Sequence, residues 1–196
     1  MEELKQLLSQ LDANSSGDEI KSTFSKIANI LLFKSYIKTE NGNFRILEIE
    51  FYFRNSQHDD GVTIIRTEKA GMWWLHDYGV DLSFESKGRT FCGGILIRSI
   101  VPLFKENEEN IICGPKNCCW ELFYSSAIEQ NSAPQIVDAS ADYMGEMGMT
   151  TRYITGKTKG IEGDYRFYVK GLNLHLGAKY DASPWKEQTK KKLCLD

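Results

Sequence analysis

The sequence lacks a long apolar stretch, because no run of hydrophobic residues approaches the ~20 that a membrane-spanning helix requires. It also lacks a recognisable secretion signal. The first five residues, Met1 to Lys5, do not show a basic segment followed by an apolar one. We therefore expect a cytoplasmic protein without a membrane partner.

The cysteines are too few and too irregularly spaced for a disulfide framework or a structural zinc site. The count of five is odd, there is no Cys-x-x-Cys pair, and no histidine lies close to a cysteine in sequence. We expect reduced thiols, as is usual in the cytosol. The five residues are Cys92, Cys113, Cys118, Cys119 and Cys194.

Positive charge is not in excess. The net charge is −3 and the sequence pI is about 5.7, whereas nucleic-acid-binding domains are usually basic. Contact with phosphates would need a local basic patch. The hydrophobic content of 41% and charged content of 26% are ordinary for a soluble protein, and 196 residues suit one domain.

The most informative segment present is residues 44–53, which alternates like a strand with one buried face. Leu47, Ile49, Phe51 and Phe53 would share the core face, which leaves Glu48, Glu50 and Tyr52 together on the other face. A carboxylate beside an aromatic ring suits an enzyme that activates water next to a stacked, flat substrate. A plain solvated face with two surface glutamates is the alternative.

The remaining pattern predicts an α+β fold (α/β in the broad sense): a single domain with helices around a mostly antiparallel sheet. Helices are expected over residues 2–12, 17–33 and 118–128, and further strands over 62–65, 73–76, 78–84, 93–101 and 165–169. A tight turn is expected at Asn41-Gly42, before the strand at residues 44–53, which we call the opening strand.

Several polar residues outside the opening strand are candidates for chemistry. Arg98 interrupts an apolar strand, so its guanidinium group needs a carboxylate, and Glu48 or Glu50 is the natural partner. His76 suits either a core histidine or a site residue. His58-Asp59-Asp60 with His76-Asp77 would be an oxygen and imidazole metal site, although the spacing is not specific.

Six short segments, in order, resemble the alkyladenine (3-methyladenine) DNA glycosylase family of the vertebrate and Bacillus type. The opening strand is similar to that family's Arg-Ile-Val-Glu-Thr-Glu-Ala-Tyr strand, and a late segment to its Arg-Phe-Tyr-Val-x-Gly. The six segments are Ile27–Leu32, Arg45–Tyr52, Gly94–Pro102, Cys113–Cys118, Thr151–Gly156 and Arg166–Gly171. The likeness covers residues 27–175, with a helical extension at 1–26 and a tail at 176–196.

The resemblance implies a curved antiparallel sheet with surrounding helices. It also implies base-excision repair, in which an alkylated purine nucleotide is flipped out of double-stranded DNA and its N-glycosidic bond is hydrolysed by a glutamate-activated water. No metal and no cofactor are implied, and a monomer is expected.

Carried over by position, the resemblance gives Glu50 the water-activating role and places Arg98 beside it as the second catalytic residue. It assigns Tyr52, His76, His58 and Asp81 to the pocket of the flipped base. It assigns duplex contacts to Tyr78, as a wedge, and to Gly114, Pro115, Lys116, Arg152 and Arg166.

Two alternatives come from other classes of function. A non-catalytic module that binds a nucleobase, nucleic acid or protein on the same scaffold is favoured by the acidic charge. A metal-assisted hydrolase would use His58, Asp59 and His76.

Overall fold

A computed structural model describes residues 1–40, 42–105, 108–123, 133–152, 154, 163–172 and 174 of the chain. In this part of the chain the helices are α1 (Glu2–Gln10), α2 (Gly17–Asn29) and α3 (Pro115–Phe123), with a π-helical turn η1 (Ile30–Lys34) and 3₁₀ turns η2 (Leu103–Lys105) and η3 (Glu108–Asn110). The strands are β1 (Ser35–Thr39), β2 (Gly42–Arg54), β3 (Trp73–His76), β4 (Gly79–Ser83), β5 (Cys92–Pro102), β6 (Ile112–Cys113), β7 (Gln135–Asp138), β8 (Met147–Thr150) and β9 (Arg166–Val169).

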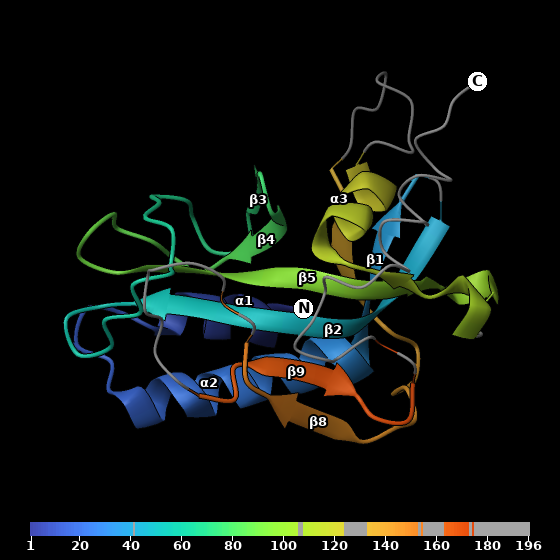
Figure 1. Ribbon diagram of the computed structural model, residues 1–196, viewed down its shortest axis with the longest axis horizontal. Coiled ribbons are helices and arrows are strands. Elements are labelled where there is room, and N and C mark those ends of the chain that lie inside the picture. Colours follow the sequence, from blue (N-terminus) through green and yellow to red (C-terminus); the bar gives the residue numbers. More distant parts are fainter. Residues whose placement is uncertain are drawn as a thin grey trace.

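All described strands join one curled antiparallel sheet. The main order is β3-β4-β5-β2-β1-β7, with β6 paired to β5, β9 paired to β2, and β8 paired to β9. The two longest strands, β2 and β5, run side by side through the middle of the molecule (Figure 1). Strand β2 changes its partner along its length, because β1 pairs with its first residues and β9 with Glu48, Ile49 and Glu50.

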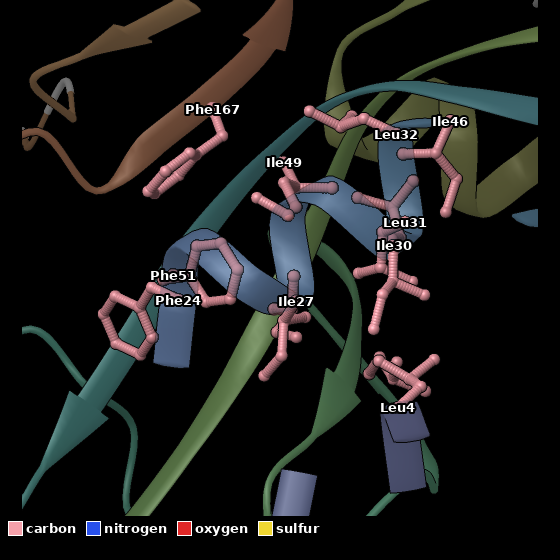
Figure 2. Close-up of a cluster of buried hydrophobic side chains, with 14 of the residues drawn as sticks. Leu4, Phe24, Ile27, Ile30, Leu31, Leu32, Ile46, Ile49, Phe51 and Phe167 are labelled. Carbon is pink, nitrogen blue, oxygen red and sulfur yellow. The ribbon is translucent and has the colours of Figure 1, made fainter. Parts of the chain in front are cut away.

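One face of the sheet carries the hydrophobic core. Ile49 and Phe51 of β2 and Phe167 of β9 lie toward side chains of α2, as Figure 2 shows. The ring of Phe51 stacks on that of Phe24 with centroids 4.4 Å apart. These rings are fully buried or nearly so, and truncating such a side chain to alanine typically costs about 3–5 kcal/mol.

The position of α2 follows from a local signal. Ser16 and Glu19 form a capping box, in which the Ser16 hydroxyl accepts from the amide of Glu19 and the Glu19 carboxylate accepts from the amide of Ser16. From this cap, residues at helical spacing face the sheet, including Ile20, Phe24 and Ile27. The helix therefore covers the apolar face and leaves the other face of the sheet for polar residues.

The α+β class and the antiparallel sheet are confirmed. Strands β2, β3, β4, β5 and β9 were predicted, whereas β1, β6, β7 and β8 were not, and residues 62–65 form a loop instead of a strand. The second helix gives way to the π-helical turn η1 at Ile30. The helix expected over 118–128 begins earlier, at Pro115. Residues 124–128 and the tail 176–196 lie outside the described residues. Within those residues no helix is long and apolar enough to cross a membrane.

Candidate active site on the polar face of the sheet

The polar face is organised in rows that cross several strands. Antiparallel partners point to the same face, and the pairing aligns Glu50 of β2 with Leu96 of β5, Asp81 of β4 and Trp74 of β3. Two residues further along β2, Tyr52 is aligned with Gly94 of β5 and Ser83 of β4. Residues distant in sequence thus project side by side from a rigid sheet.

The two glutamates of β2 share a face, as predicted, but they are not surface residues. Glu48 and Glu50 are both 0% exposed. Arg98 joins them, because its Nε donates to Oε1 of Glu48 over 3.1 Å and its Nη1 donates to Oε2 of Glu50 over 2.9 Å. The predicted pairing of Arg98 is therefore confirmed, and it involves both carboxylates.

A second buried arginine balances the negative charge of the two glutamates. Arg166 of β9 lies with its Nε 2.5 Å from Oε1 of Glu48 and 3.8 Å from Oε1 of Glu50. The Ser99 hydroxyl donates to the other oxygen of Glu48 over 2.6 Å. Two buried anions beside two buried cations avoid the cost of an isolated buried charge. Glu48 is therefore fully committed to hydrogen bonds that hold the sheet together.

Glu50 is held differently, because its two oxygens have unequal surroundings. The Tyr52 hydroxyl donates to Oε2 over 2.7 Å, so this oxygen has two donors including Arg98. Oε1 is buried and accepts no hydrogen bond from the part of the chain that the structure describes. Burial, followed by the charge of Glu50, raises the pKa of Tyr52 well above its ordinary value, so the phenol stays protonated and donates. A buried carboxylate oxygen without a donor is the position at which a water would be held.

One face of the Tyr52 ring is covered by a cation. The guanidinium carbon of Arg152 lies 4.7 Å from the Tyr52 ring centroid and 5.0 Å from that of Tyr165. Arg152 is fixed by a bidentate pair with Asp60, at 2.8 and 3.0 Å. His58 packs near Tyr165, and burial lowers its pKa. A stacked substrate would have to use the opposite face of the Tyr52 ring.

A second polar cluster lies on β3 and β4. Nη2 of Arg66 is 2.7 Å from Oδ2 of Asp81, and Nε2 of His76 is 3.1 Å from Oδ1 of Asp81. Nδ1 of His76 accepts from the amide of Tyr78, an arrangement that fits the tautomer in which Nε2 carries the hydrogen and donates to Asp81. The Arg66 guanidinium lies 3.9 Å above the Trp74 ring.

The exposed turn between β3 and β4 lies against the start of α3. A Cβ atom on Gly79 would be 2.8 Å from Cβ of Pro115, so this approach requires a glycine, and its φ of +146° is also one that other residues rarely adopt. Tyr78 is 67% exposed beside it. Lys116, one residue into α3, is exposed as well. The predicted wedge and the predicted Gly114–Lys116 contact are thus neighbours.

The remaining predicted site residues do not form the contacts that were expected of them. Arg152 and Arg166, predicted to contact nucleic acid, are buried in the ion pairs described above. Asp59 pairs with Arg54 at 2.6 Å, His58 packs near Tyr165, and His76 pairs with Asp81. In the described ranges no three His, Cys, Asp or Glu side chains are grouped to hold a metal ion. Residues 153, 155 and 156, in the Thr151–Gly156 segment of the resemblance, lie outside the described residues.

Sequence reasoning missed several members of this face. They are Arg66, Trp74, Ser83 and Ser99, whereas Asp60 was named only as a candidate metal ligand. Trp74 lies two residues before His76, so the alternation of a strand could have placed both on the same face. The long loop between β2 and β3 supplies Asp60 and Arg66, and a loop offers no periodicity from which to infer direction.

The described thiols are free and buried. Burial raises the pKa of Cys92, Cys113, Cys118 and Cys119, which makes them poor nucleophiles. They act as small core residues, and Cys194 lies outside the described residues.

No protein-family model and no curated protein sequence matches the chain.

Proposed function

We propose that the protein hydrolyses the N-glycosidic bond of a flipped purine nucleotide in damaged DNA, with Glu50 as the general base. In this reaction a water held at Oε1 loses its proton to Glu50 and attacks the anomeric carbon. The bond from that carbon to the base breaks, and the base leaves with the electron pair. Glu50 is the protein group that takes up the proton, the water comes from solvent, and an alkylated purine, which is cationic in the nucleotide, leaves as a neutral base.

The observation that carries this proposal is the asymmetry of Glu50. Arg98 and Tyr52 both bind Oε2 and fix the plane of the carboxylate, while Oε1 has no donor among the described residues. A structural glutamate, such as Glu48, has both oxygens bound. Glu50 is therefore oriented by its neighbours and keeps one oxygen for a proton transfer.

Tyr52 links this carboxylate to the surface. It is partly exposed, and a base stacked on the ring face opposite Arg152 would bring its sugar toward Glu50, which lies two residues away on the same face of β2. Stacking on an aromatic ring contributes roughly 1–3 kcal/mol per base, comparable with the few kcal/mol needed to flip a weakened base. Tyr78 and Lys116 are exposed and, in this proposal, would contact the duplex.

The test is base release from a DNA duplex that carries 3-methyladenine or hypoxanthine, measured in single turnover. Glu50→Gln should lower the rate by roughly 10²- to 10⁴-fold, the range that a positioned general base contributes. The fold should survive, since Arg98 keeps its bond to Glu48. Lys38→Gln, on the opposite part of the sheet, is the matched surface control. Unchanged release by Glu50→Gln would refute the assignment, and so would release that a chelator abolishes.

A second candidate is a non-catalytic module that binds a nucleobase on the same face. It is favoured by the complete burial of Glu50 and by a net charge of −3, which weakens attraction to phosphates. The two candidates differ in one measurement. A binding module would hold damaged DNA or free base, and this binding would depend on Tyr52, but no base would be released even over many hours.

A further inference from the structure

A buried asparagine joins the first two helices to the loop that follows β2. Nδ2 of Asn55 donates to the carbonyl oxygen of Asp12 over 2.9 Å and to that of Ser15 over 2.8 Å. Its Oδ1 accepts from the amides of Gln57 and His58 over 3.0 and 2.7 Å. These bonds use both hydrogens of the side-chain amide and both lone pairs of its oxygen. Asn55, which is 4% exposed, therefore fixes two segments of backbone to each other.

The turn between α1 and α2, residues 11–16, is a firm support for this asparagine. Inside the turn the amide of Asp12 donates to Oγ of Ser15 over 3.0 Å, and the amide of Ser15 donates to the carbonyl oxygen of Asp12. The buried leucines of α1 and the capping box of α2 hold the helices on either side of it. The turn belongs to the helical extension at residues 1–26, which lies outside the region of resemblance.

The loop that Asn55 anchors carries Asp60 into the fold. The amides of Asn55 and Asp60 both donate to the carbonyl oxygen of His58, over 3.1 and 2.9 Å. The Thr63 hydroxyl then donates to Oδ2 of Asp60 over 2.9 Å. Asp60 is 0% exposed, so its carboxylate is held by the turn of chain that Asn55 closes.

From Asp60 the contacts continue to Glu50. Arg152, in its bidentate pair with Asp60, also donates to the carbonyl oxygen of Phe51 over 2.9 Å and covers the Tyr52 ring. The Tyr52 hydroxyl donates to Oε2 of Glu50. A displaced Asp60 would shift the guanidinium and with it the ring, and a misplacement of about 1 Å can lower a catalysed rate roughly 10²-fold.

We propose that Asn55 is a positioning residue for Glu50, which ties the turn between α1 and α2 to Asp60 and acts through Arg152 and the Tyr52 hydroxyl. This inference rests on the proposed function for the role of Glu50. It gives the first two helices a second task besides covering the core, because they support the residues that orient the catalytic carboxylate.

The first experiment follows the Tyr52 ring by NMR in the full chain, labelled with ¹³C in its nine tyrosines. The signal that disappears in Tyr52→Phe belongs to Tyr52. Asn55→Ser removes the donor to both carbonyls of the turn but keeps a hydroxyl that can accept from the loop amides. We expect it to move the Tyr52 signal in the direction in which Asp60→Asn moves it. An unmoved signal in folded Asn55→Ser would overturn the proposal.

The matched control for this experiment is Ser56→Ala. Ser56 is the exposed neighbour of Asn55, and its hydroxyl donates to the carbonyl oxygen of Ala13, in the same turn, over 3.1 Å. Its removal takes one bond from the same contact without touching the path to Asp60. The Tyr52 signal of Ser56→Ala should therefore coincide with that of wild type, and an equal shift in both variants would contradict a specific role for Asn55.

The second experiment is a double-mutant cycle on base release in single turnover. Asn55→Ser alone should lower the rate about tenfold, no more than Tyr52→Phe, because it acts through that hydroxyl. In the Tyr52→Phe background the same substitution should change the rate by less than about twofold, whereas independent sites give additive effects. A merely structural role for Asn55 predicts the additive result, which would overturn the proposal.

The outcome is separable from that of the proposed function, because the tyrosine signal does not depend on hydrolysis. A protein that releases no base, but whose Tyr52 signal responds to Asn55→Ser, would refute the hydrolase and retain the path from Asn55 to Tyr52. Base release with additive effects would do the reverse. Thermal unfolding checks each variant, and if Asn55→Ser fails to fold, Asn55→Asp, which keeps the acceptor and loses the donor, takes its place.

Discussion

The hydroxyl of Tyr52 donates a 2.7 Å hydrogen bond to the oxygen of Glu50 that Arg98 also binds. One tyrosine thereby has two functions, since its ring borders the surface while its hydroxyl determines which carboxylate oxygen is occupied. The ring is itself held from behind by Arg152, whose guanidinium is fixed by Asp60. The orientation of Glu50 therefore depends on residues that do not touch it.

Substitutions at Tyr52 should separate these two functions. Tyr52→Phe keeps the ring but removes a donor to a charged acceptor, so the rate of base release should fall about tenfold or more with little change in affinity for damaged DNA. Tyr52→Ala removes the stacking surface, and affinity should fall roughly 5- to 150-fold. Single-turnover rates and binding titrations measure the two effects, with Tyr36→Phe on β1 as the control. Equal effects of both substitutions on affinity would argue against stacking.

Removing Glu48 should unfold the protein more readily than removing an exposed glutamate. Glu48→Ala removes a buried carboxylate to which Arg98, Arg166 and Ser99 all donate, which should lower the free energy of unfolding by about 3–5 kcal/mol. Glu146→Ala breaks only the exposed pair with Lys170 at 3.3 Å and should cost at most ~1 kcal/mol. Urea unfolding followed by circular dichroism gives both values. Similar midpoints for the two variants would contradict the buried network.

Acid should destabilise the fold in part through His58. Burial lowers its pKa below the ordinary value of 6.5, an effect that Asp60 partly opposes and Arg152 reinforces. As pH falls through 6.5, the unfolded chain takes up a proton that the folded chain does not, so stability falls, and this loss levels off below the folded pKa. His58→Gln should therefore lose less stability than wild type between about pH 7.5 and 5.5, measured as urea midpoints. Gln57→Ala, an exposed neighbour, should retain the wild-type pH dependence.

Gly79 should be intolerant of a side chain. Alanine there combines an unfavourable φ with contacts of 2.8 and 2.9 Å to Pro115, so Gly79→Ala should lower the free energy of unfolding by about 2–4 kcal/mol. Gly17→Ala at the start of α2 meets no atom within 4 Å and should raise it by about 0.4–1 kcal/mol. Thermal unfolding of the two variants gives the comparison. An unchanged melting temperature for Gly79→Ala would show that α3 shifts easily.

The centre of the fold was predictable because its signals are local. Alternation in β2 separates the core face from the face of Glu48 and Glu50, and the apolar surroundings of Arg98 require a carboxylate partner. The sequence did not predict that both glutamates would be fully buried. Period-two patterning says which residues share a face, but not whether a second layer of chain covers that face.

The periphery of the site was not predictable from the same signals. Strands β7 and β8 have four residues each and a single buried residue between them, so no alternation of buried and exposed positions distinguishes them from loops. Arg66 comes from a loop whose path is set by Asp81 and Trp74. Nothing in the sequence around Gly94 indicates that the guanidinium group of Arg66 packs closely against it.

Strand β9 pairs with β2 although Arg166 and Glu48 are 118 residues apart in the chain. During synthesis from the N-terminus, β2 and β5 are complete long before β9 leaves the ribosome. Before β9 is made, Arg98 is the arginine in the centre of the sheet that can pair with Glu48 and Glu50. The carboxylates consequently acquire their final surroundings only at a late step, so a chain cut short before residue 166 would present an uncompensated negative charge on this face and resist compaction there.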